Sequence, residues 1–126
     1  MRERRRISSG SPFEKRIGFS RAVAVEGRIT VSGTAPVRAD GSCDPDAEKQ
    51  ARRCLEIIGR ALQDADSSLD HVVRTRIYLV DAADADAVGR AHAQVFGETR
   101  PASTMVVVSA LLDPRWKVEI EADAEP

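Results

Sequence analysis

The side chains best suited to acid–base chemistry lie near the end of this 126-residue chain. Glu119 and Glu121 stand two apart within the apolar segment Val118 to Ala122, so in a strand both carboxyl groups project from the same face. A buried carboxyl group can position water and supply a proton to a leaving group. Two alternatives remain open, because a half-buried strand produces this spacing by default and Glu119 can equally form an ion pair with a neighbouring arginine or lysine.

Four further polar residues are candidates for holding a ligand. Arg74 and Arg76 share one face of a predicted strand, where Arg76 can offer its guanidinium group to a ligand or form a salt bridge with a carboxylate of the last strand. Ser103 and Thr104 can hydrogen-bond a neutral polar ligand. No Ser-His-Asp set accompanies them, which argues against a serine nucleophile.

The two cysteines and two histidines do not form a recognisable metal site. Cys43 and Cys54 lie eleven apart with no CxxC motif, whereas a structural zinc ion needs four well-spaced ligands. Cys54 falls on the apolar stripe of a predicted helix and is expected to be buried. His92 lies at the margin of a second stripe, where a packing role competes with a role in a pocket. The sequence therefore predicts no metal site.

The composition bounds the class of protein and its partners. A formal net charge of −1, with 31% charged and 42% hydrophobic residues, is typical of a soluble globular protein and argues against nucleic-acid or membrane partners. Residues 1–12 include a basic run and are expected to form a flexible tail before a single domain over residues 13–126. No long apolar stretch indicates a signal peptide or membrane span, so we expect a cytoplasmic protein.

Two patterns define the first half of the domain. Ala22 to Ser32 reads as two strands that turn at Glu26-Gly27, where glycine allows a positive φ. Asp44-Pro45 then opens a helix, with aspartate as the cap and proline in the first position. The apolar stripe of this helix comprises Ala47, Ala51, Cys54, Leu55, Ile58, Leu62 and Ala65.

The second half alternates strands with one more helix. We expect a strand over Val72 to Val80, a helix from Asp84 to Gly97, and strands over Ala102 to Ser109 and Trp116 to Ala122. The order β-β-α-β-α-β-β predicts an α+β domain in which two helices cover one face of a mixed sheet. The other face is half apolar and carries many charges, so we expect it to meet further copies of the chain.

With these elements in order, several short motifs resemble the reactive-intermediate deaminase family, Rid, also called YjgF. Ile17 to Ser20 with Ala22-Val23 is similar to the family's GPYSQAV motif, and Ser32-Gly33 is similar to its SGQ. The closing strands match at Pro101-Ala102 and Val118 to Ala122. Further matches lie at Gln50 to Leu55, Asp70, Val72-Val73, Asp81, Val88 and Phe96.

The resemblance implies a chorismate-mutase-like fold, a homotrimer, and ligand pockets in the clefts between subunits. It also implies hydrolysis of reactive enamines and imines to a carbonyl compound and ammonia, with no cofactor. In that scheme an arginine after Pro-Ala holds the substrate carboxylate, the backbone near the SGQ glycine contacts the substrate, and a glutamate of the last strand positions water.

Carried over residue by residue, the resemblance assigns catalysis to Glu119 and substrate contact to Gly33. Phe19 stands where the motif has tyrosine, Ser103 where it has the arginine, and Gly89 where an asparagine is expected. Loss of a guanidinium–carboxylate contact removes about 1.5–3 kcal/mol. That loss slows turnover of a carboxylate-bearing imine roughly ten- to a hundredfold.

We therefore expect a divergent family member that acts on imines or enamines without the usual carboxylate. Phe19, Ser103 and Arg76 would shape what enters the pocket. Arg100 is close in sequence to the lost arginine, but its side chain points the wrong way for a strand that begins at Ala102. The alternative function is a trimer that binds a small metabolite in the same cleft without chemistry.

Overall fold

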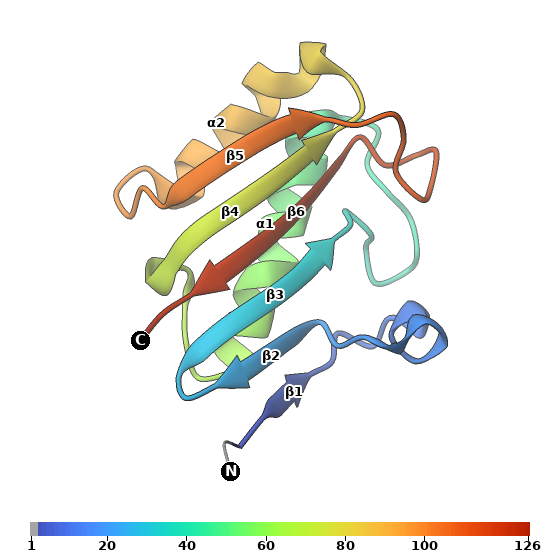
Figure 1. Ribbon diagram of the computed structural model, residues 1–126. Helices are drawn as coiled ribbons and strands as arrows, with labels where there is room; N and C mark the ends of the chain where they lie inside the picture. Colours follow the sequence, from blue (N-terminus) through green and yellow to red (C-terminus); the bar gives the residue numbers. More distant parts are fainter. Residues whose placement is uncertain (1–2) are drawn as a thin grey trace.

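The computed structural model describes residues 3–126, which form one six-stranded sheet with two long helices (Figure 1). The strands lie in the order β1-β2-β3-β6-β4-β5. Their bounds are β1 (Arg5–Ile7), β2 (Ala22–Val25), β3 (Arg28–Thr34), β4 (Val72–Leu79), β5 (Ala102–Val107) and β6 (Val118–Ala124), and the helices are α1 (Ala47–Asp64) and α2 (Ala85–Phe96). Short helical turns cover Glu14–Gly18, Leu69–His71 and Ala82–Asp84.

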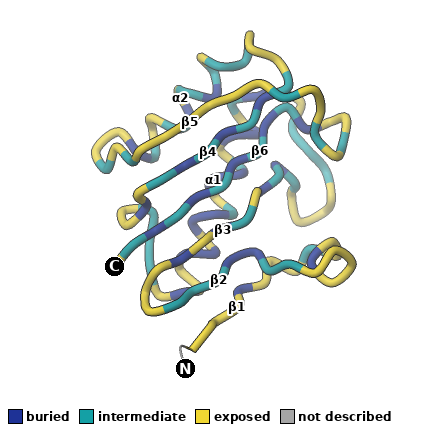
Figure 2. Tube along the Cα trace, viewed as in Figure 1, coloured by how far each residue is buried: buried dark blue, intermediate teal, exposed yellow. Residues whose placement is uncertain are grey.

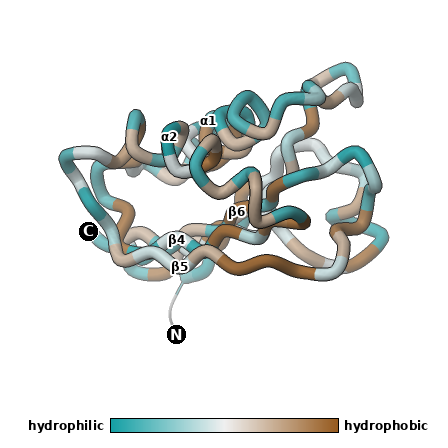
Figure 3. Tube along the Cα trace, turned by 90° about the horizontal axis from the view of Figure 1, so that it is seen from above, coloured by the Kyte–Doolittle hydropathy of each residue, from teal (hydrophilic) through white to brown (hydrophobic). Residues whose placement is uncertain are grey.

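Both long helices pack on the same face of the sheet, as Figure 3 shows from above. The sheet is mixed, because β4 and β5 run parallel while the other neighbouring strands are antiparallel. Helix α2 makes the crossover that a parallel pair requires. The predicted α+β class, with two helices on one face of a mixed sheet, is confirmed.

The hydrophobic core lies between the helices and the sheet. Alternate residues of β4 and β6 are buried there, as the change of colour along each strand in Figure 2 shows. The residues between them point to the opposite face of the sheet. Thr75, Ile77 and Leu79 of β4 point inward as the alternation predicted. The predicted apolar stripe of α1 is buried in full. The hairpin turn is also confirmed, since Glu26 and Gly27 both adopt positive φ.

The N-terminal segment differs from the predicted flexible tail. Arg5–Ile7 is an edge strand that pairs with Ala22 to Ala24, and Arg5 forms an ion pair with Asp66 at 2.8 Å. The prediction was wrong for this stretch because a run of basic residues gave no signal of strand pairing. Residues 1–2 lie outside the described range.

Several predicted boundaries are also corrected. Helix α1 is capped by Asp46, whose side chain accepts from the Lys49 N–H, whereas Asp44 accepts from the Asp46 N–H. Strand β5 is shorter than predicted and ends at Val107. Strand β6 begins at Val118, because a turn from Asp113 to Trp116 precedes it, and continues to Ala124 in register with β3.

The face away from the helices is the one seen in Figure 1, and we call it the open face. It carries charged side chains from β4 and β6. Strand β5 forms one edge of the sheet, and its side chains are exposed, including Met105, Val106 and Val107. This combination of charge and exposed apolar surface agrees with the predicted composition of the face.

Candidate functional site

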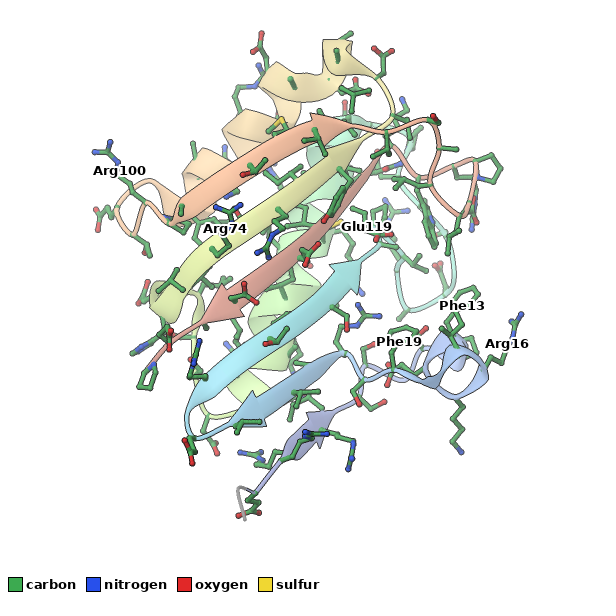
Figure 4. All side chains as sticks on the ribbon, in the orientation of Figure 1. Phe13, Arg16, Phe19, Arg74, Arg100 and Glu119 are labelled. Carbon is green, nitrogen blue, oxygen red and sulfur yellow. The ribbon has the colours of Figure 1, made fainter. Side chains whose placement is uncertain are left out.

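Glu119 projects from β6 on the open face, between β3 and β4 (Figure 4). Strand alternation directs it there, because its neighbours Val118 and Ile120 are fully buried on the helix side. Its carboxylate packs against Gly33 of β3. A Cβ atom at residue 33 would lie 2.5 Å from Glu119 Oε2, so only glycine leaves room for the carboxylate in this position.

The electrostatic setting of Glu119 shifts its pKa upward. Within residues 3–126 its carboxylate has no hydrogen-bond or ion-pair partner at contact distance. Burial raises the pKa of Glu119, the nearby Arg21 guanidinium lowers it, and Glu121 raises it again, with a net upward shift. A half-buried carboxyl group with a raised pKa is suited to acid–base work.

Arg21 is the residue of this site that the sequence interpretation missed. It is only 7% exposed, and Nη1 donates to the Gly33 carbonyl at 2.7 Å and to Thr34 Oγ1 at 3.1 Å. Arg21 and Glu119 therefore lie on either side of Gly33. The sequence signal that could have identified Arg21 is its position directly before the apolar residues that begin at Ala22.

The segment before β2 surrounds Arg21. Glu14 accepts hydrogen bonds from the Ser9 N–H, the Ser9 hydroxyl and the Ser11 N–H at 3.0, 2.9 and 3.3 Å, and Arg21 Nε donates to Ser9 Oγ at 3.3 Å. Although burial raises the pKa of Glu14, these hydrogen bonds hold it below its ordinary value. Phe19 stacks on the Arg21 guanidinium at 5.5 Å, which places its ring beside the same cation.

The other predicted site residues are distributed differently. Arg76 pairs with Asp123 at 3.3 Å and Glu121 at 3.6 Å, so the structure contains the salt bridge that was the alternative to ligand binding. Tyr78 lies opposite Glu119 in the β4–β6 register and donates its hydroxyl hydrogen bond to Glu121. Glu121 thus has hydrogen-bond and ion-pair partners, whereas Glu119 has none among the described residues.

Ser103 does not share a sheet face with Glu119 in the single chain. Its hydroxyl accepts from Thr75 Oγ1 at 2.8 Å, and Thr75 is fully buried on the helix side. Thr75 also contacts His92 Nε2 at 2.9 Å, while the His92 ring packs on Phe96 with centroids 4.7 Å apart. Ser103 and His92 therefore belong to one hydrogen-bonded chain at the β5 edge, in which His92 is packed.

Arg74 and Arg100, two further arginines near this edge, differ in whether they contact the sheet. Arg74 Nη2 donates to Thr104 Oγ1 at 2.9 Å, and its buried Nε has no acceptor within residues 3–126. Arg100 precedes β5 with a positive φ, and its side chain points away from the sheet at the end opposite Glu119 (Figure 4). The structure therefore does not bring Arg100 to the Glu119 site.

Other parts of the described chain lack the features of a second catalytic centre. A hollow of about 450 Å³ lies between α1 and the preceding loop, and Glu119 is not among its lining residues. No three His, Cys, Asp or Glu side chains in residues 3–126 are grouped to hold a metal ion. Cys54 is buried as predicted, and burial raises the pKa of its thiol. In the same range, no helix has the length and apolarity to cross a bilayer.

Comparisons with known proteins agree with this architecture. The family model described as endoribonuclease L-PSP matches residues 11–126. An uncharacterized protein of Streptomyces coelicolor is 38% identical over 123 residues, covering 95% of this chain and 90% of the relative. A mitochondrial protein of Schizosaccharomyces pombe, mmf1, is 31% identical and covers 94% of this chain and 71% of the relative.

Solved structures give the same result at the level of the fold. A Mycobacterium tuberculosis member of the YjgF/YER057c/UK114 family superposes with a TM-score of 0.91 at 44% identity, covering 98% of this chain and all of that chain. The Yersinia pestis protein YyfA, described as a Rid family protein of unknown function, superposes with a TM-score of 0.86 at 29% identity, with the same coverage of both chains.

Proposed function

Because the chain belongs to the family described as endoribonuclease L-PSP, which includes the YjgF and Rid proteins, we propose that it hydrolyses reactive imines or enamines to a carbonyl compound and ammonia. The reaction uses no cofactor. Water adds to the C=N carbon, the carbon–nitrogen bond then breaks, and the nitrogen leaves as ammonia after it gains protons. The protein must therefore place a water molecule and move protons between oxygen and nitrogen.

The setting of Glu119 is the observation that carries the proposal. Its carboxylate is half-buried, packs against Gly33, and is free of hydrogen-bonding partners within residues 3–126. In its ionised form it accepts a proton from the attacking water, and in its protonated form it returns that proton to the leaving nitrogen. The raised pKa supports this exchange, because a group titrating nearer to the working pH populates both forms. Gly33 contributes its backbone to substrate contact.

The substrate class follows from the edge of β5. Ser103 offers a neutral hydroxyl group where the family motif has a cation, and Arg76 is already paired with carboxylates. Neither arrangement provides a free guanidinium for a substrate carboxylate in this chain. We therefore assign imines and enamines without that carboxylate as substrates, with Phe19 and Ser103 shaping the pocket.

A homotrimer with its sites between subunits is part of the same proposal. Glu119 and Ser103 lie on opposite faces of the sheet, so one chain alone cannot present both to one ligand. Exposed apolar side chains of β5 favour a protein partner on this side, as does the buried Nε of Arg74, which has no acceptor among the described residues. Another copy of the chain supplies that partner, and the assembly would work in the cytoplasm.

Non-catalytic binding of a small metabolite in the same cleft is the second candidate. The engaged state of Arg76 favours it, because a cation held by two carboxylates stabilises a site without taking part in chemistry. RNA cleavage, which the family description names, suits this site poorly. The open face interleaves Arg76 with Glu121 and Asp123, and such a surface does not attract a phosphate backbone.

The test is Glu119→Gln, measured against Glu121→Gln as a matched control. Imines of an unsubstituted aliphatic or aromatic ketone are generated in situ, and ammonia release is followed with each purified variant. We expect Glu119→Gln to abolish turnover while Glu121→Gln retains it. Ammonia release that never exceeds the uncatalysed rate with any imine would reject hydrolysis, and a change of ligand affinity alone would favour the binding function.

A further inference from the structure

Arg21 is a buried cation whose hydrogen bonds all go to groups around the Glu119 site. Its Nη1 donates to the Gly33 carbonyl and to Thr34 Oγ1, and Nε donates to Ser9 Oγ. The first bond fixes the backbone of the residue against which the Glu119 carboxylate packs. A displacement of Arg21 would therefore move the surface on which Glu119 rests.

The charge of Arg21 acts on the same carboxyl group. Arginine stays protonated in proteins, and a positive charge held in a fixed, buried position interacts more strongly than one exposed to water. Arg21 lowers the pKa of Glu119, opposing the larger effect of burial. Burial lowers the pKa of Arg21, while Glu14 and then Glu119 oppose that effect, with a net downward shift.

The sequence places this arginine within the motif near the start of the domain. The segment Ile17 to Val23 resembles GPYSQAV, and Arg21 stands at the glutamine of that motif. Glutamine can reach the same carbonyl but carries no charge. The chain thus has serine at residue 103 and a cation, Arg21, beside Glu119.

We propose that Arg21 is a positioning residue that holds the Gly33 backbone against which the Glu119 carboxylate packs and places a fixed positive charge beside that carboxylate. The role rests on the proposed function, since it matters for catalysis only if Glu119 moves protons. Arg21 does not bind the substrate in this scheme. Without its charge, the effect of burial would be less opposed, and the pKa of Glu119 would rise further.

Other charged or titratable groups also lie near Glu119, and the experiment must distinguish their effects on its pKa from the effect of Arg21. Glu121 follows on the same strand and disfavours ionisation of Glu119. Tyr78 lies opposite on β4, and its pKa is raised first by its hydrogen bond to Glu121. Cys54 lies beneath on α1, where burial is the main cause of its raised pKa and Glu119 adds to it. Arg76 of β4 is a further cation of the open face, paired with Glu121 and Asp123, and Lys117 stands two residues before Glu119. Arg21 is the cation that lowers the pKa of Glu119.

The experiment is a carbon NMR titration of the Glu119 carboxyl group, assigned by its loss in Glu119→Gln. Arg21→Gln restores the motif residue, Arg21→Lys keeps the charge, and Arg90→Gln removes an exposed helix cation as the control. We expect Arg21→Gln to raise the titration midpoint of Glu119 by roughly half a pH unit or more. The lysine variant and the Arg90 control should keep the wild-type midpoint.

A second measurement needs no substitution of Arg21 and decides the matter if Arg21→Gln does not fold. In the wild-type protein the nitrogen resonance of Arg21 Nε should titrate with the midpoint of Glu119, and Glu119→Gln should abolish that response. The proposal would be overturned if the Arg21 Nε resonance does not change as Glu119 titrates. It would also be overturned if a folded Arg21→Gln protein keeps the wild-type titration midpoint of Glu119.

Activity then separates this inference from the proposed function. If an imine is hydrolysed, the limb of the pH–rate profile that reports Glu119 should move in Arg21→Gln by as much as the NMR midpoint. A purely structural arginine would lower kcat without moving that limb. If no imine is hydrolysed, the proposed function fails, while the two titrations still decide whether Arg21 controls Glu119.

Discussion

Replacing Gly33 with alanine tests whether the position of the Glu119 carboxylate, rather than the stability of the fold, sets activity. The new Cβ would lie 2.5 Å from Glu119 Oε2, 3.3 Å from Cδ and 3.7 Å from Cγ. Ordinary contact begins at 3.4 Å, so the oxygen must withdraw by about 0.9 Å. The methyl group therefore acts on the reactive end of the side chain and hardly on its stem.

The two consequences differ in size. A displaced side-chain end costs about 0.5–1.5 kcal/mol if it leaves its preferred rotamer. The loss of glycine freedom in the unfolded chain returns about 0.4–1 kcal/mol, so stability should change by no more than about 1 kcal/mol. A misplacement of about 1 Å at a catalytic group costs on the order of a hundredfold in rate.

The assay compares Gly33→Ala with Gly89→Ala, which makes the same chemical change in α2. A Cβ atom at residue 89 meets nothing within 4 Å, and alanine in a helix interior is stabilising by up to about 1 kcal/mol. Thermal unfolding and kcat/KM for an imine generated in situ are measured for both variants. We expect an approximately hundredfold loss of kcat/KM in Gly33→Ala and parent-like activity in Gly89→Ala.

Two results would refute this reasoning. If Gly33→Ala keeps its full rate, Glu119 does not need its place against Gly33, and its role as the group that positions water is wrong. If Gly33→Ala unfolds at a much lower temperature, the contact is structural and the rate carries no information about catalysis.

Three further outcomes are expected. Ser103→Arg should increase turnover of a carboxylate-bearing imine roughly ten- to a hundredfold, as a charge-assisted pair allows, with little effect on an uncharged imine measured beside it. Gln50→Leu should lower the free energy of unfolding in urea by about 2–4 kcal/mol, because the 1%-exposed amide contacts three backbone groups that would lose their partner. Glu119 has a folded-state pKa above its ordinary 4.5, so the folded protein binds this proton more tightly than the unfolded chain does. The stability of the wild-type protein relative to Glu119→Gln should therefore fall as the pH rises from 4.5 through the folded-state pKa. Thermal unfolding of both proteins at several pH values measures this difference.

Local patterns account for what the sequence predicted well. The stripe of α1, the turn at Glu26-Gly27 and the alternation of β4 depend on near neighbours and on burial, which a single sequence encodes directly. Gly33 and Glu119 were brought together by resemblance to a family, and the close packing of one against the other agrees with that assignment. Their roles in catalysis stay predictions.

Non-local pairing accounts for what the sequence did not reveal. Arg21 is buried only because β3 and the segment around Ser9 provide acceptors for it, and none of these lies next to it in sequence. Ser103 was assigned to a pocket because it follows Pro-Ala. The face of the sheet on which its side chain lies depends instead on the β4–β5 register, which places Ser103 beside Thr75 and allows their hydrogen bond. Arginines and serines have no pattern that separates such anchors from surface residues.

Strand β1 affects which N-terminal truncations and N-terminal tags the domain can tolerate. A polypeptide starting at Phe13 would leave Ala22 to Ala24 paired with β3 alone, without a strand on their outer side, and would lose the Arg5–Asp66 pair. The bared backbone groups of β2 would then be open to pairing with other molecules, so shortened versions should show a greater tendency to aggregate. Tags attached ahead of Arg5 extend from the rim of the sheet and leave this protective strand in place.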